Sequence, residues 1–301
     1  MADRSAIHRL PPRRAARPGL APLLLLLLVL LIPVSGAPAP AGATVSAGGD
    51  PSPLRLVVNI PALRLDVYEN GALAASYPVT VGKPSDPTPE GHYRLQRVVW
   101  NPWWHPPFNR RPMDRVTPPG PQNPMGKVKL FFTHMYYLHG TPKLHEIGVP
   151  ASRGCVRLRN ADAVALALLV HRHAVAPLPA AKLDELTSTR SWRTHEYPLV
   201  GDVQIDLLYQ LAEVGSDGVL HVYPDFYHEA TLPLPELAAR AVVAAGHPRE
   251  LVDLQALVAA IGTAPEAPLS LPVADLLLAE DGADTAVAGI STGNEGSKPL
   301  P

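Results

Sequence analysis

The spacing of hydrophobic and polar residues predicts a domain built mainly from β-strands. In the segment RLDVYE, the apolar Leu65 and Val67 alternate with polar neighbours, as in a strand with one buried face. Asn70-Gly71 follows, and this dipeptide favours the two-residue turn of a β-hairpin. Similar patterns recur along the chain. The predicted strands cover residues 54–60, 63–69, 72–82, 92–99, 128–138, 203–211 and 219–223.

Three segments have the apolar spacing of a helix instead. The first, residues 161–174, follows Asn160, whose side chain is suited to cap a helix N-terminus. The other two, residues 236–245 and 249–261, are each followed by a glycine, which favours a helix C-terminus. The pattern therefore predicts a mainly β domain with one helix in its second half, followed by a C-terminal α+β extension.

A long irregular segment, residues 100–126, separates two of the predicted strands. It contains Trp100, Trp103, Trp104 and eight prolines. Loops of this length inside a compact domain are usually functional or disordered, and the tryptophans argue against disorder. We expect a lid over a bound ligand, with Trp103 and Trp104 among the substrate-binding residues; a packed Ω-loop is the alternative.

The N-terminus has the layout of a secretory signal peptide. A segment with five arginines precedes the apolar run Leu23 to Ile32, and Ala41-Gly42-Ala43 offers a cleavage site of the A-x-A type. The run is short for a membrane span. We therefore predict an exported protein of the periplasm or cell envelope with a cleaved signal peptide, and an uncleaved N-terminal anchor is the alternative.

Composition and charge narrow the class of function. The first 43 residues hold five of the 26 basic and one of the 27 acidic side chains, which leaves a net charge of −5 on the rest. A chain of this charge lacks the basic surface of a nucleic-acid-binding protein. The predicted parts are a signal peptide (1–43), a linker (44–53), a catalytic domain (54–175), a C-terminal β/α region (176–280, continuous with the catalytic fold to about 227) and a disordered tail (281–301).

Cys155 is the single cysteine of the chain, and its neighbours point to a reactive thiol. An exported cysteine without a partner in its own chain forms an intermolecular disulfide, stays inert or has a function. Arg153, Gly154 and Arg157 favour the last, because cations and backbone N–H groups lower a thiol pKa. His139, at the end of a predicted strand, is placed to act as the base.

A zinc site is the main alternative for the histidines of this region. His134, His139 and His145 are close in sequence, but their spacing fits no common ligand motif. His134 and His139 would also face opposite sides of a straight strand. We therefore expect no metal or other cofactor. A zinc-dependent wall peptidase remains a rival hypothesis that a chelator would test.

The stretch from His139 to Asn160 resembles the catalytic motif of the L,D-transpeptidases, which have a YkuD-type domain. The resemblance rests on H-G-T at residue 139, S-x-G-C-V-R-L from Ser152, and a following helix that starts with Asn. It extends to T-P-E-G at residue 88 and N-P-W-W at residue 101, and covers about residues 54–227. It implies a YkuD-like β-sandwich or open barrel.

The resemblance also implies the roles of individual residues. Cys155 would be the nucleophile and His139 the base, oriented by the carbonyl of Gly140. The amides of the loop from Ser152 through Arg153 and Gly154 to Cys155 would bind the oxyanion. Arg157 would hold the donor substrate, and Tyr137 is a further candidate substrate-binding residue. Many members have histidine where this chain has Arg153, which leaves any relay through a second imidazole unsupported.

The activity implied is acyl transfer on peptidoglycan. A tetrapeptide stem would be the donor, D-alanine would leave, and the amine of a second stem would accept the acyl group to form a 3-3 crosslink. Water as acceptor would make the protein an L,D-carboxypeptidase, and a protein amine would make it an anchoring enzyme for an envelope protein. Carbapenem-type β-lactams would inhibit it. A non-catalytic wall-binding module is the alternative of another class.

Overall fold

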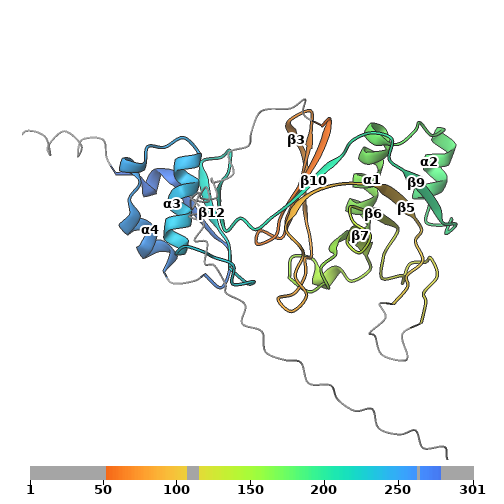
Figure 1. Ribbon diagram of the computed structural model, residues 1–301, viewed down its shortest axis with the longest axis horizontal. Helices are drawn as coiled ribbons and strands as arrows, with labels where there is room; N and C mark the ends of the chain where they lie inside the picture. The colour runs from red at the N-terminus through yellow and green to blue at the C-terminus, as the bar shows by residue number, and fades with distance from the viewer. Residues whose placement is uncertain (1–51, 107–114, 263–264, 279–301) are drawn as a thin grey trace, which may run out of the picture. The chain divides into compact units, whose positions relative to one another are not determined.

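The computed structural model describes residues 52–106, 115–262 and 265–278. The predicted signal peptide and C-terminal tail lie outside this part of the chain, as does most of the predicted linker. Among the residues described, no helix combines the length and the hydropathy that a membrane crossing requires. Figure 1 shows the arrangement of the elements.

The first of two five-stranded sheets has the strand order β3-β2-β1-β10-β4. β1 and β10 run parallel, and the other neighbours are antiparallel. Asn70 and Gly71 both have positive φ, as the predicted hairpin turn between β2 and β3 requires. The bounds are β1 Leu54–Asn59, β2 Arg64–Glu69, β3 Ala72–Pro78, β4 Gly91–Arg94 and β10 Gln204–Leu208.

The second sheet has the order β8-β7-β6-β5-β9 and carries the predicted catalytic residues. β7 and β8 are parallel, and the other pairs are antiparallel. Two single predicted strands, at 92–99 and 128–138, are each broken in two here, so that prediction was wrong. The bounds are β5 Arg97–Trp100, β6 Val128–Phe131, β7 Tyr137–Thr141, β8 Val156–Arg159 and β9 His195–Pro198.

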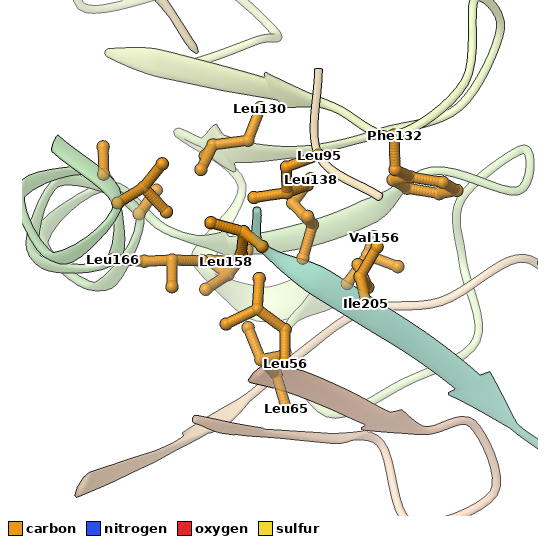
Figure 2. Close-up of a cluster of buried hydrophobic side chains, with 14 of the residues drawn as sticks. Leu56, Leu65, Leu95, Leu130, Phe132, Leu138, Val156, Leu158, Leu166 and Ile205 are labelled. Atoms are coloured by element: carbon orange, nitrogen blue, oxygen red, sulfur yellow. The ribbon is translucent and has the colours of Figure 1, made fainter. Parts of the chain in front are cut away.

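One hydrophobic core joins the two sheets. Leu130 of β6, Leu138 of β7, and Val156 and Leu158 of β8 are completely buried and point into a common cluster with side chains of the first sheet (Figure 2). Since side chains alternate along a strand, the residues between them lie on the opposite face of this sheet. That face is where the candidate active site forms.

Helix α1, Asn160–Ala174, follows β8 directly and packs on β6, β7 and β8. Its buried side chains, including Leu166 and Val170, continue the core. The prediction that Asn160 caps this helix was wrong: the N-cap position is Arg159, and it makes no side-chain capping bond. The Oδ1 atom of Asn160 instead accepts a hydrogen bond from the Lys127 amide at 3.0 Å.

A short helix, α2, Ala180–Thr187, precedes β9 and was not predicted from the sequence. The predicted strand at 203–211 contains β10. Since β9 and β10 complete the two sheets, the strands of this fold continue to Leu208, well beyond α1.

The C-terminal residues form a second core of their own. A three-stranded sheet, β11-β12-β13, packs against α3, and α4 packs on α3 (Figure 1). The predicted helix at 249–261 is broken: a 3₁₀ turn, η2, precedes α4, and Asp253 caps α4 by accepting from the amides of Gln255 and Ala256. The bounds are β11 Ala212–Val214, β12 Val219–Val222, α3 Leu234–Ala244, η2 Arg249–Leu251, α4 Leu254–Ile261, β13 Leu269–Pro272 and η3 Val273–Leu276.

The structure confirms the fold class, which is mainly β with a helix directly after the Cys155 segment and an α+β extension, and it adds the short helix α2.

Candidate active site

The register of β7 and β8 brings the predicted catalytic residues to one face of the second sheet. These strands pair Leu138 with Val156, and His139 with Arg157. Cys155 precedes β8 and therefore lies across from Tyr137, one diagonal step from His139. The Sγ atom of Cys155 lies 3.8 Å from the Met135 carbonyl oxygen.

His139 is buried and held by a single well-defined hydrogen bond. Its side chain is 2% exposed, and its Nδ1 atom donates to the carbonyl oxygen of Gly140 at 2.7 Å. Since a carbonyl oxygen only accepts, the proton of the neutral ring sits on Nδ1, which leaves Nε2 as an acceptor. Burial lowers the pKa of His139 to about 3, with a further contribution from Arg157 and a smaller one from Lys129. The imidazole is therefore neutral near pH 7.

Gly140 of the H-G-T motif has a steric reason to be glycine. A Cβ atom at this position would lie 2.1 Å from Oδ1 of Asn160, and one at Gly126 would lie 2.0 Å from the same atom. The Asn160 side chain thus lies against both backbones. This contact fixes the segment that orients His139, and the sequence pattern had assigned Asn160 only a capping role.

The loop before Cys155 is shaped by its own hydrogen bonds. The buried Ser152 hydroxyl donates to the Cys155 carbonyl at 2.6 Å and accepts from the Gly154 amide at 3.0 Å. The Ser152 amide donates to Val81. Two of the four predicted oxyanion donors are thus already engaged, which leaves the amides of Arg153 and Cys155.

Gly154 is constrained by both conformation and space. Its φ angle is +96°, which side-chain-bearing residues rarely adopt, and a Cβ atom there would lie 2.5 Å from the Tyr136 ring. Its carbonyl accepts from the Thr88 hydroxyl at 3.0 Å, which links the loop to the T-P-E-G segment.

The Cys155 thiol is partly buried, and its charged neighbours differ from those expected. Burial raises the pKa of Cys155, and hydrogen bonds from Tyr137 together with the charges of Lys129 and Arg157 oppose that rise. Arg153, which we had expected to favour the thiolate by charge, is exposed and instead contributes to lowering the pKa of Asp86. Of the two arginines expected to favour the thiolate, Arg157 therefore does so, and Arg153 acts on Asp86 instead.

Lys129 is the residue that the sequence analysis missed. It is the cross-strand partner of His139 on β6. Its Nζ atom lies 4.0 Å from the centre of the Tyr137 ring and 4.6 Å from that of Phe131. Alternation within VKLF could have identified it, because the two buried neighbours Val128 and Leu130 place Lys129 on the opposite face.

Arg157 is already paired in this structure. Its guanidinium contacts the carboxylate of Glu146, on the 3₁₀ turn η1, Leu144–Glu146, and the Lys143 ammonium lies 2.8 Å from the other oxygen of Glu146. The partner of Arg157 thus lies in the loop between β7 and β8.

The tryptophan loop is only partly as predicted. Trp100 is completely buried and donates from Nε1 to Nε2 of His171 at 2.9 Å, so its assignment to a lid was wrong. Trp103 is 49% exposed, and the backbone of Trp104 pairs with that of Thr117. Residues 107–114 lie outside the described part of the chain, so the lid stays a prediction for Trp103 and Trp104.

The three histidines of the zinc hypothesis lie on different elements. His134 lies in the turn between β6 and β7, not on a strand as predicted, His139 lies on β7, and His145 is exposed on η1. Within the ranges that the structure describes, no three His, Cys, Asp or Glu side chains are placed to share a metal ion.

Comparison with known proteins agrees with this geometry. Residues 53–179 match the YkuD family, the L,D-transpeptidase catalytic domain. The chain is 30% identical over 142 residues to the "Putative L,D-transpeptidase YkuD" of Bacillus licheniformis, and the match covers 46% of this chain and 74% of that relative. The chain belongs to the L,D-transpeptidase family. Cys155 and His139 both lie within the matched catalytic domain.

Other members of the L,D-transpeptidase family are matched over a smaller part of their length. The chain is 33% identical over 117 residues to the "Probable L,D-transpeptidase YbiS" of Escherichia coli, which is 36% of this chain and 38% of the relative. It therefore spans about two fifths of that protein. A solved L,D-transpeptidase from Mycobacterium smegmatis is 17% identical with a TM-score of 0.34, over 52% of this chain and 59% of the other.

Proposed function

We propose that this protein is a peptidoglycan L,D-transpeptidase that works through a Cys155 thioester. The observation that supports this most directly is the juxtaposition, on one sheet face, of the lone thiol and the neutral His139. The hydrogen bond from His139 to Gly140 leaves Nε2 free to take a proton. The match of residues 53–179 to the family supports the same chemistry.

The first half-reaction is acylation of the thiol. The proton of Cys155 passes to Nε2 of His139, and Sγ attacks the carbonyl between the L-centre of the third-position diamino acid and the terminal D-alanine. The amides of Arg153 and Cys155 stabilise the oxyanion. The C–N bond then breaks, His139 returns the proton to the amine of D-alanine, and a thioester remains on Sγ.

The second half-reaction transfers the acyl group to an amine. The acceptor we propose is the side-chain amine of a neighbouring stem, which gives a 3-3 crosslink and regenerates the thiol. Thioesters react readily with amines, and exclusion of water from the site would favour that outcome over hydrolysis. Water would instead give an L,D-carboxypeptidase, and an envelope protein would be attached if its lysine were the acceptor.

The proposed location is the cell envelope, where the stem peptides occur. The basic N-terminus, the apolar run after it and the small residues at 41–43 support export through a cleaved signal peptide. Carbapenem-type β-lactams are proposed inhibitors, because a strained lactam carbonyl would acylate the same thiol.

Intact-mass spectrometry of the purified protein with a disaccharide-tetrapeptide donor tests the proposal. We expect release of D-alanine and a transient acyl mass on Cys155, and no such mass in Cys155→Ala. A second stem should then discharge the thioester into a crosslinked product, whereas discharge by water alone would identify a carboxypeptidase. If neither the donor nor a carbapenem acylates the folded protein, the site is non-catalytic and the proposal is wrong.

A further inference from the structure

The face of the second sheet that carries Cys155 also carries the ammonium of Lys129, which forms no ion pair with an acidic residue among the described ranges. We propose that Lys129 is a positioning residue that provides the counter-charge of the Cys155 thiolate. This role rests on the proposed acyl transfer. The nucleophile of that reaction, Cys155, lies next to β8, and the base, His139, lies on β7. Lys129 would add a residue of β6 to the same site.

The strand register places Lys129 next to both reacting side chains. Lys129 pairs with His139 across β6 and β7, and Tyr137 lies two residues before His139 on the same face. The ammonium lies 4.0 Å from the centre of the Tyr137 ring, and Tyr137 and Lys129 both act to lower the pKa of Cys155. Tyr137 is therefore a neighbour of both the ammonium and the sulfur.

Two aromatic rings hold the ammonium in this position. Nζ of Lys129 contacts the rings of Tyr137 and Phe131, whose centres lie 5.2 Å apart. Cation–π contacts of this kind stabilise a charge without neutralising it. The positive charge remains available to the sulfur.

The other cations near the thiol differ from Lys129 in having a carboxylate partner. Arg157 of β8, which also acts on Cys155, is paired with the Glu146 carboxylate. Arg97 of β5, which stacks on Phe131, has the Glu196 carboxylate of β9 at 3.1 Å. No carboxylate lies within ion-pair distance of the Lys129 ammonium in the described ranges. Lys129 is thus the cation at this site whose nearest anionic partner would be Cys155 itself.

The surroundings of His139 show why such a counter-charge is needed. Burial and the two nearby cations lower the pKa of His139 to about 3, while burial raises the pKa of the thiol. Proton transfer from Sγ to Nε2 is therefore strongly uphill for the isolated pair. An ammonium beside the sulfur offsets part of that difference, because it stabilises the thiolate formed when the proton leaves. Burial lowers the pKa of Lys129 to about 8, so its side chain still carries the positive charge near pH 7.

Alkylation of the free enzyme with iodoacetamide tests this role. The chain has one cysteine, so a single mass increment reports the thiolate of Cys155 at each pH. We expect Lys129→Met to slow alkylation at pH 7 about tenfold, and the difference from the wild type to shrink above pH 8, where the wild-type ammonium loses its own proton. Lys129→Arg should stay close to the wild type. Lys182→Met is the matched control, because it removes a lysine of α2 that pairs with Glu185, and its profile should be unchanged.

The outcomes separate this role from its rivals. An unchanged alkylation rate of Lys129→Met at pH 7 overturns the proposal. If the same variant also has a raised KM for the tetrapeptide, Lys129 binds a substrate carboxylate instead. Lys129→Gln gives a second charge-free variant if the Met variant has a lowered Tm. Alkylation requires no stem peptide, so this result stands apart from that of the donor-acylation experiment.

Discussion

The Oδ1 atom of Asn160 occupies the space that a side chain on Gly140 would need. The two residues belong to the start of α1 and to β7, and a Cβ atom on Gly140 would lie only 2.1 Å from that oxygen. Because the Gly140 carbonyl also holds His139 at 2.7 Å, the contact joins a packing constraint to the orientation of the proposed base.

Gly140→Ala should therefore damage both the fold and the site. Oδ1 of Asn160 would have to give up its bond to the Lys127 amide, or β7 would have to move, at a cost of about 1–3 kcal/mol in the free energy of unfolding. Donor acylation should fall at least tenfold. Urea denaturation and the acylation assay measure the two effects. Gly120→Ala is the control, because nothing lies within 4 Å of a Cβ atom there.

Gly154→Ala should lower the stability of the protein more than an alanine substitution at a glycine that has open space around it. Gly154 and Gly148 both have positive φ, so alanine is strained at either position, by about 1 kcal/mol. At Gly154 the new methyl would also meet the Tyr136 ring at 2.5 Å, whereas at Gly148 nothing lies within 4 Å. The difference in Tm between the two variants measures the steric part. An equal decrease in Tm for the two variants would show that the Cys155 loop moves to accept the methyl group without losing stability.

The buried His139 should make the protein less stable in acid. The pKa of His139 is about 3 in the folded state and 6.5 when the side chain is exposed. Between pH 3 and pH 6.5, His139 is therefore protonated in the unfolded chain and neutral in the native protein. This term is absent above pH 6.5 and lowers the free energy of unfolding by up to about 1.4 kcal/mol per pH unit as the pH falls towards 3.

Urea denaturation between pH 7 and pH 4 measures that slope. His139→Gln should have a smaller slope, because the variant lacks the group. His145→Gln, which replaces an exposed histidine of η1, should keep the slope of the wild type. A wild-type slope unchanged by His139→Gln would mean that other groups cause the acid sensitivity.

Glu146→Gln should weaken donor binding through Arg157. The carboxylate of Glu146 contacts one terminal nitrogen of Arg157, which fixes the guanidinium and leaves its other N–H groups for a substrate carboxylate. We expect KM for the tetrapeptide donor to rise several-fold with little change in kcat. Glu185→Gln, which removes a carboxylate of α2, is the control. An unchanged KM would mean that Arg157 does not bind the donor.

Much of the site could be predicted from the sequence because its signals are local. Cys155 and His139 were identified from a lone thiol in the S-R-G-C-V-R segment and a histidine at a strand end. The alternation of apolar and polar residues predicted β1 and β2, and Asn70-Gly71 predicted the turn between β2 and β3. The broken strands at 92–99 and 128–138 were missed, because their apolar residues continue through the bend and only pairing with different neighbours reveals it.

The sequence by itself determined a mainly β chain, the position of a hairpin turn, and a candidate pair of a thiol and an imidazole, because alternation, Asn-Gly and motif spacing act over a few residues. Only the tertiary structure decided which groups surround that pair. The site also contains Lys129, Glu146 and Asn160. These residues lie there because the strand register and the close approach of distant backbone segments place them there. Those relationships depend on which strands become neighbours, and one residue of slip would turn Lys129 away from the sulfur.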